Sequence, residues 1–154
     1  MNWKELRDKI YYQDGSLRDI YIKDTTQEDW RKWVDYVTAN YPVAFTTHDG
    51  DVTSDKIDFS KVVDLWNGSL DSSISATIHV GGILVKAYFF SDEEIENDIT
   101  PKEVNTLDDH NGLVEYLMGL SKALKKNVVL TPENEPETTL ISVYEGNVFL
   151  LPTN

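Results

Sequence analysis

Two consecutive segments near the amino terminus repeat their hydrophobic residues with different periods. Residues 17–23 (LRDIYIK) alternate, with Ile20 and Ile22 on one side and Tyr21 and Lys23 on the other, which predicts a strand. The next hydrophobic residues recur at the i, i+3, i+4 and i+7 spacing of one helix face: Trp30, Trp33, Val34 and Val37. We therefore expect an amphipathic helix that ends near Tyr41-Pro42 and places both of its tryptophans in the core.

The clearest local signal lies at residues 73–90, where two runs of strand-forming residues flank Gly81 and Gly82. A two-residue glycine loop favours a tight hairpin. Counting outward from this loop gives four apolar pairs: Val80 with Ile83, Ile78 with Val85, Ala76 with Ala87, and Ile74 with Phe89. That face belongs in the core, since a shift of one residue would expose all of it. The opposite face is mixed and is available to a ligand: Ser75, Thr77, His79, Leu84, Lys86 and Tyr88.

The other segments predict shorter elements and one long helix. We expect strands at 43–47 and 128–131, a polar loop at 48–58, helices at 60–66 and 107–126, and a final hairpin within 138–151 that turns at Gly146-Asn147. Ser91 and Glu94 have the capping-box spacing, which predicts a short acidic helix after the first hairpin. This order favours one α+β domain over residues 1–154, with a mostly antiparallel sheet and helices packed on one face.

The net charge of −13 and its uneven distribution along the chain indicate which partners the protein could bind. Residues 87–154 alone carry 13 acidic and 4 basic residues. Such a field repels nucleic acid and anionic membranes and attracts cationic surfaces, which points to a basic protein partner. The plainer alternative is that the acidity serves solubility.

Composition bears on the compartment and on the chemistry. Cysteine is absent, which excludes a cysteine nucleophile and a disulfide framework and fits a reducing compartment. The first ten residues, MNWKELRDKI, are charged where a signal peptide needs an apolar run, and no run approaches the ~20 apolar residues of a membrane span. We expect a cytoplasmic protein.

No motif for metal, cofactor or nucleophilic chemistry is present in the sequence. The three histidines, His48, His79 and His110, lack a second histidine at the spacing of a helical zinc site. Residues 49–60 begin like a calcium loop, but Ser54 and Ser60 stand where a glycine and a bidentate glutamate are needed. We therefore expect no metal, no cofactor and no catalytic residue.

Three stretches together resemble a known kind of protein: DGSLRDIYI at 14–22, NDITPKEV at 97–104 and LTPENEP at 130–136. They resemble small, acidic, single-domain bacterial proteins of unassigned activity, similar in style to the immunity proteins of polymorphic toxin systems. The resemblance implies a cytosolic bacterial protein that neutralises a toxin by binding it. It implies no catalytic residues.

The first functional hypothesis is a non-enzymatic binding protein whose acidic residues cover a basic toxin or another cationic protein. Its acidic residues are Asp92, Glu93, Glu94, Glu96, Asp98, Asp108, Asp109, Glu133, Glu135 and Glu137. Trp3 and Trp66 lie in polar surroundings and are candidate anchors, because buried aromatic residues dominate binding hot spots.

Two alternatives remain open from sequence. One is an enzyme or small-molecule binder that uses the mixed hairpin face around Thr77, His79, Lys86 and Tyr88, with Glu94 or Glu115 as a carboxylate partner. It requires a concave pocket in which these groups converge. The other is a subunit of a homo-oligomer that pairs through an exposed sheet face.

Overall fold

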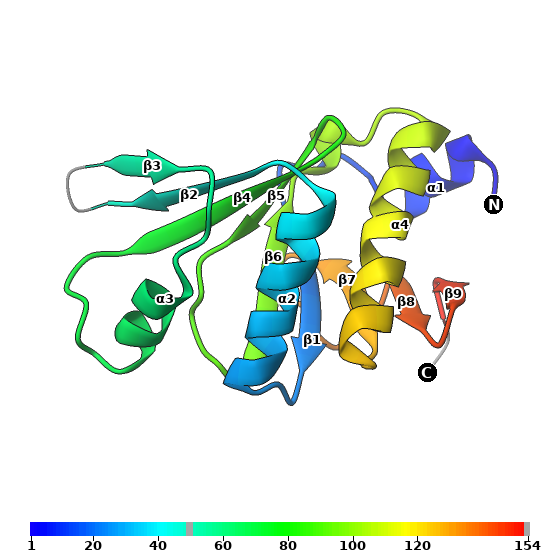
Figure 1. The fold of residues 1–154 in the computed structure, drawn as a ribbon. Helices are drawn as coiled ribbons and strands as arrows, with labels where there is room; N and C mark the ends of the chain where they lie inside the picture. Colours follow the sequence, from blue (N-terminus) through cyan, green and yellow to red (C-terminus); the bar gives the residue numbers. More distant parts are fainter. Residues whose placement is uncertain (49–50, 153–154) are drawn as a thin grey trace.

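A computed structural model describes residues 1–48 and 51–152, and in them it shows a single nine-stranded sheet (Figure 1). The strands are β1 (Arg18–Lys23), β2 (Val43–Thr47), β3 (Val52–Ser54), β4 (Ile74–Val80), β5 (Ile83–Ala87), β6 (Glu94–Ile99), β7 (Val128–Pro132), β8 (Ile141–Tyr144) and β9 (Asn147–Leu150). Their order across the sheet is β3-β2-β4-β5-β6-β1-β7-β8-β9. Every neighbouring pair runs antiparallel.

The helices lie on one face of this sheet, as the sequence predicts. They are α1 (Trp3–Lys9), α2 (Gln27–Asn40), α3 (Phe59–Trp66) and α4 (Leu107–Leu124), with a 3-10 turn at Pro101–Glu103. Figure 1 shows α2 and α4 side by side in front of the central strands. Trp30 and Trp33 are buried at 1% and 0% exposure, so the α2 stripe does face the core. The α+β class and the one-sided layering are confirmed. None of the helices in the described part of the chain has the length and hydrophobicity needed to cross a membrane.

The β4–β5 hairpin has the register that the glycine loop dictates. Val80 pairs with Ile83, Ile78 with Val85 and Ala76 with Ala87, and all six side chains are buried. Gly81 has φ +59°, a conformation that a glycine adopts without steric cost. The pairing ends at Ala87, so Phe89 does not face Ile74 across the ladder, although both are buried.

The prediction of an acidic helix after this hairpin is wrong, because residues 94–99 form β6 in the centre of the sheet. Ile95, Asn97 and Ile99 are buried and alternate with half-buried acidic residues, which is the period of a strand. Ser91 Oγ accepts only a local hydrogen bond from the backbone nitrogen of Glu93, at 3.1 Å. Pairing with β5 and β1 on both sides satisfies the backbone groups that a helix would have satisfied internally.

Smaller differences from the sequence predictions concern the ends of the sheet. The last hairpin turns at Glu145-Gly146, one residue earlier than expected, because Tyr144 pairs with Asn147. Glu145 and Gly146 have φ values of +52° and +78°, as a two-residue hairpin turn requires.

The expected loop at 48–58 contains the edge strand β3, while residues 49 and 50 lie outside the described residues. Helix α1 was not expected; Asn2 caps it by accepting from the backbone nitrogen of Glu5.

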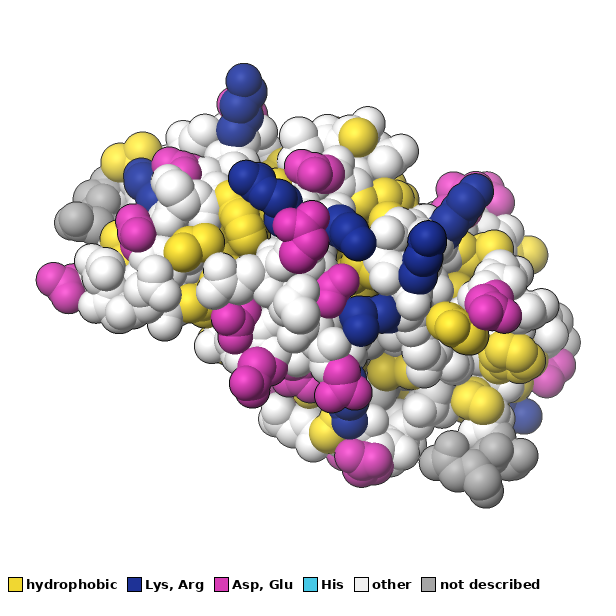
Figure 2. Space-filling model, turned by 60° about the horizontal axis from the view of Figure 1, so that its bottom comes forward, with side chains coloured by type: hydrophobic (Ala, Val, Ile, Leu, Met, Phe, Trp, Pro, Cys, Tyr) yellow, Lys and Arg dark blue, Asp and Glu magenta, His cyan; other side chains and the backbone are white. Residues whose placement is uncertain are grey.

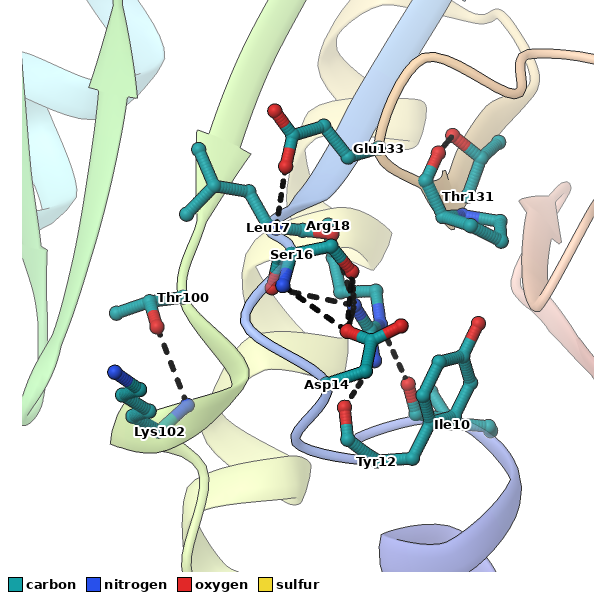
Figure 3. Close-up of polar contacts among 11 residues, drawn as sticks. Ile10, Tyr12, Asp14, Ser16, Leu17, Arg18, Thr100, Lys102, Thr131 and Glu133 are labelled. Carbon is teal, nitrogen blue, oxygen red and sulfur yellow. Dashed lines mark hydrogen bonds and ion pairs between the residues drawn. The ribbon is translucent and has the colours of Figure 1, made fainter.

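A fully buried arginine ties the amino-terminal loop to the sheet (Figure 3). Arg18 Nε donates to the carbonyl oxygen of Ile10 at 2.8 Å, and its two terminal nitrogens donate to the carbonyls of Leu17 and Tyr12. Its guanidinium also lies 4.0 Å from the centre of the Tyr12 ring. The carboxylate of Asp14 is 4.0 Å from the guanidinium and half exposed. The cost of burying the Arg18 charge is therefore offset mainly by the carbonyl oxygens and by the face of the Tyr12 ring.

Helices α2 and α4 cross at a glycine. Tyr36 of α2 lies over Gly119 of α4, and its hydroxyl donates to the carbonyl oxygen of Tyr116 at 3.2 Å. Below this crossing, Trp33 Nε1 donates to the Tyr116 hydroxyl at 3.0 Å, and that hydroxyl donates to Asn97 Oδ1 at 2.6 Å. This buried chain of hydrogen bonds links both helices to β6.

Candidate functional site

The face of the sheet opposite the helices, here called the uncovered face, carries carboxylates on its two central strands. In β6 the residues that alternate with the buried ones are Glu94, Glu96 and Asp98. The β1–β6 register places Asp98 opposite Asp19 of β1, a residue that the sequence analysis did not select. Side chains directly opposite each other in an antiparallel pair lie about 4.5–5.5 Å apart at Cβ, so like charges in these positions repel.

Asp19 is buried beneath the loop that joins β7 to β8. Its side chain is 4% exposed. Asp19 Oδ2 accepts hydrogen bonds from the Tyr21 hydroxyl at 3.1 Å and from the backbone nitrogen of Asn134 at 2.8 Å. In the same loop, Glu133 Oε1 accepts from the backbone nitrogen of Leu17 at 2.7 Å (Figure 3). The loop therefore brings a further carboxylate to the same place. We call Asp19, Glu94, Glu96, Asp98 and Glu133 the carboxylate cluster.

The electrostatics of the carboxylate cluster favour protonation. Burial and the negative charge of Asp19 raise the pKa of Asp98 to about 6, although Lys86 on the neighbouring strand opposes the shift. Burial, with Asp19 and Glu94 nearby, raises the pKa of Glu96. Burial raises the pKa of Asp19 as well, against the two hydrogen bonds that it accepts. Burial and mutual repulsion therefore destabilise the charged forms of these carboxylates, and a positive group placed among them would stabilise those forms.

The structure brings some of the predicted acidic residues together and separates others. Glu94, Glu96, Asp98 and Glu133 belong to the carboxylate cluster, and Glu137 lies beside β1, where its carboxylate is 3.5 Å from Lys23 Nζ. Glu135 is exposed in the β7–β8 loop, Glu93 is exposed before β6, and Asp92 accepts from the Gln27 amide at 3.1 Å. Asp108 and Asp109 lie in the first turn of α4, where Asp109 completes a capping box with Thr106. In these positions Asp108 and Asp109 stabilise the start of the helix.

The two tryptophans considered as partner anchors are engaged inside the molecule. Trp66 is partly buried in the core, and its Nε1 donates to the carbonyl oxygen of Phe89 at 2.9 Å. Trp3 is partly buried and stacks on Tyr11 with ring centres 6.2 Å apart. Both side chains therefore support the fold of the segments next to them.

The mixed face of the first hairpin does not converge on a pocket around its histidine. His79 is exposed opposite Leu84, and Lys86 pairs with Thr77 on one side and Asp98 on the other. Tyr88 lines a cavity beside Trp66, and His79 does not line it. Five cavities in the described part of the protein have linings that include neither Thr77, His79 nor Lys86. None of these five cavities therefore supplies the concave site that the ligand hypothesis centred on His79 requires.

His110 has a different environment from the other histidines. It is 6% exposed, and its Nδ1 shares a 2.6 Å hydrogen bond with the Tyr11 hydroxyl, which connects α4 to the residues after α1. Burial lowers the pKa of His110, so the neutral ring is favoured in the folded protein. The described residues contain no group of three or more histidine, aspartate or glutamate side chains placed to hold a metal ion.

Basic and apolar side chains occupy other surfaces. Figure 2 shows lysine and arginine side chains in a band across the molecule with acidic side chains on both sides, so this face is not uniformly acidic. Figure 2 also shows hydrophobic side chains gathered at the lower right of the view. The β8–β9 hairpin exposes Tyr144, Val148 and Phe149, at 43%, 36% and 51%. Because β9 ends the sheet, this edge is the surface on which the oligomer hypothesis is best tested.

The signal that could have revealed the carboxylate cluster was present in the sequence. Asp19, Tyr21 and Lys23 share one side of the alternating segment 17–23, opposite Ile20 and Ile22. Reading 94–99 as a strand would have placed acidic residues on one side of it too. Comparisons of this chain with protein-family models, with curated proteins and with solved structures gave no match.

Proposed function

We propose that this protein is a non-enzymatic binding protein that uses the uncovered face of its sheet to hold a cationic partner protein. One observation carries the proposal: the β1–β6 register places Asp19 opposite Asp98 on this face, and burial together with neighbouring carboxylates raises the pKa of Asp19, Glu96 and Asp98. A partner that supplies lysine or arginine side chains converts this repulsion into attraction.

The geometry of the cluster suits a protein surface better than a single small ion. Its acidic side chains are spread over β1, β6 and the β7–β8 loop, and they follow the strands at every second residue. A partner with several basic groups at a similar spacing can pair with more than one of them. The sheet that presents them is stiff, because β1 and β6 are paired on both sides.

An immunity-type inhibitor is the most concrete form of this proposal. Masking a toxin needs a rigid surface of opposite charge and no catalytic group of its own, and the basic partner would be a toxin that acts on an anionic substrate such as nucleic acid. The resemblance of the segments at 14–22, 97–104 and 130–136 to immunity proteins points the same way.

The test uses a decalysine peptide as the cationic probe and two matched triple variants. The first variant, Glu94→Gln/Glu96→Gln/Asp98→Asn, neutralises the three carboxylates of the cluster that lie on β6. The second, Asp35→Asn/Asp64→Asn/Glu115→Gln, removes the same number of charges from exposed positions on α2, α3 and α4. Titration calorimetry at low and then moderate salt measures the dissociation constant of each.

We expect the unmodified protein to bind the peptide with an affinity that falls as salt rises. The cluster variant should lose at least about tenfold in affinity, and the control variant should lose clearly less. Equal losses in both variants would mean that only the total charge matters. That result would mean that the acidic residues serve solubility alone, and it would overturn the proposal.

A further inference from the structure

Two exposed aromatic side chains follow the end of β5, the strand that pairs with β6 of the carboxylate cluster. Phe90 is 72% exposed, the highest value among the large hydrophobic residues, and Tyr88 is 37% exposed. Their rings stack with centres 5.5 Å apart and an angle of 27° between the planes. We call Tyr88 and Phe90 the aromatic pair. Exposing two such rings side by side forgoes the free energy that their burial would provide, which is typical of a contact surface.

The backbone holds the aromatic pair in place through the residue between its members. Phe89 is buried and has φ +59°, a conformation that is strained for a bulky residue. Its left-handed conformation ends the β5 ladder and turns Phe90 out into solvent. Strain of this kind persists only where the surroundings enforce it.

Two tryptophans hold Phe89 in this conformation. Trp66 Nε1 donates to the carbonyl oxygen of Phe89, and Trp30 Nε1 donates to the carbonyl oxygen of Ser91, each at 2.9 Å. These bonds fix the chain on both sides of Phe90. The Phe89 ring packs against Trp30 and Trp33 with ring centres 5.1 and 6.0 Å apart. The aromatic pair is therefore presented by a rigid support.

Tyr88 links the aromatic pair to the carboxylate cluster. Tyr88 comes two residues after Lys86, so it leaves the sheet on the same uncovered face. Burial and the nearby charge of Asp98 raise the pKa of Tyr88, which places the ring within the field of that carboxylate. Both members of the pair line a cavity of about 600 Å³, and its lining also includes Trp66 and Asp92.

We infer that the aromatic pair is the subsite for an arginine side chain of the cationic partner, with the guanidinium stacked on Phe90 or Tyr88 and paired with Asp98. This inference rests on the proposed function. Arginine is favoured over lysine here because its planar guanidinium is weakly hydrated, stacks on aromatic faces and can pair with a carboxylate through two parallel hydrogen bonds. A purely apolar partner would leave the carboxylates desolvated without a counter-charge.

Two peptides of equal charge test the inference: decaarginine and decalysine, each titrated against the unmodified protein, Phe90→Ala and Phe149→Ala. Phe149 is the matched control, since it is an exposed aromatic residue on β9, at the edge of the sheet. The indole N–H resonance of Trp66 serves as a local reporter because its acceptor is the carbonyl next to Phe90. The resonance of Trp33, whose indole is bonded to Tyr116 in the core, is the internal reference.

We expect decaarginine to bind about two- to fivefold more tightly than decalysine, which is the range for a stacked cation at an exposed site. Phe90→Ala should remove this preference by weakening decaarginine binding more than decalysine binding, and Phe149→Ala should leave the preference intact. Decaarginine should shift the Trp66 resonance and leave the Trp33 resonance in place.

The outcomes separate this inference from the proposed function. If both peptides bind with equal affinity to the unmodified protein and to Phe90→Ala, the arginine subsite is wrong while cation binding stands. A preference that Phe149→Ala removes as completely as Phe90→Ala would also overturn the subsite. If neither peptide binds the unmodified protein, the proposed function itself fails.

Discussion

Replacing Gly119 by alanine tests the crossing of α2 and α4. A Cβ atom at this position would lie 2.7 Å from two ring carbons of Tyr36 and closer still to its hydroxyl oxygen. The backbone of Gly119 is helical, so no turn or positive φ demands a glycine there. The space taken by Tyr36 is therefore the reason for the glycine.

The expected change in the free energy of unfolding combines three contributions. Alanine is better than glycine inside a helix by about 1 kcal/mol. Forcing the Tyr36 ring away costs about 1–3 kcal/mol of overpacking. Displacing its hydroxyl from the Tyr116 carbonyl removes a hydrogen bond worth about 0.5–1.5 kcal/mol. We expect Gly119→Ala to destabilise the protein by about 2 kcal/mol.

The control is Gly112→Ala, seven residues earlier in the same helix. A Cβ there meets nothing within 4 Å, so this change should stabilise the protein by about 1 kcal/mol. A second control is Gly119→Ala in a Tyr36→Ala background, where the space is empty and the change should also be stabilising. Urea unfolding followed by tryptophan fluorescence measures all of these. Equal effects at both glycines, or a loss that survives Tyr36→Ala, would refute the reasoning.

Three further changes have defined outcomes. Arg18→Lys should lower the free energy of unfolding by about 2–4 kcal/mol, because an ammonium cannot reach the separate carbonyls that the buried guanidinium serves, and urea unfolding would show it. Tyr116→Phe should cost about 2–3 kcal/mol by leaving the indole of Trp33 and the amide of Asn97 without their shared partner, again measured by urea unfolding. Asp98→Asn should raise the free energy of unfolding by about 1 kcal/mol at pH 7, a value that allows for screening of the charge by solvent. Near pH 4 the same change should have little effect. The sign follows because the folded-state pKa of about 6 exceeds the unfolded value of 3.8, so the folded state binds more protons and loses stability as pH rises between them.

Local sequence patterns predict the elements whose contacts are local. The β4–β5 hairpin follows from two adjacent glycines and the alternation around them. Helix α4 follows from four leucines on one face, at positions 113, 117, 120 and 124, and from the acidic residues in its first turn. These features need no knowledge of the rest of the chain, because turn chemistry and helix caps are determined by a few neighbouring residues.

The carboxylate cluster depends on pairing between distant segments. Tyr21 and Glu96 are 75 residues apart, and they meet only because β6 inserts between β5 and β1. The acidic residues of β6 have low strand propensity and also carry a capping-box spacing, so local signals favour a helix there. Sheet pairing on both sides overrides that preference.

Arg18 and Phe89 were also beyond local prediction. A charged residue in an alternating segment suggests a solvated side chain, yet Arg18 is fully buried because three carbonyl oxygens converge on it. A positive φ at a phenylalanine runs against its intrinsic preference, and only the tertiary hydrogen bonds from two tryptophans account for it. The stacked and exposed arrangement of Tyr88 and Phe90 could therefore not be predicted from the sequence.

The pKa of the Asp98 carboxyl, followed by carbon NMR in the absence and presence of decalysine, tests the central account most directly. In the free protein we expect a pKa of about 6, caused by burial and the neighbouring carboxylates. If the uncovered face holds the cationic probe, bound ammonium groups must lower this pKa towards its ordinary value. An Asp98 pKa that stays near 6 while the peptide is fully bound would place the probe elsewhere and contradict the account.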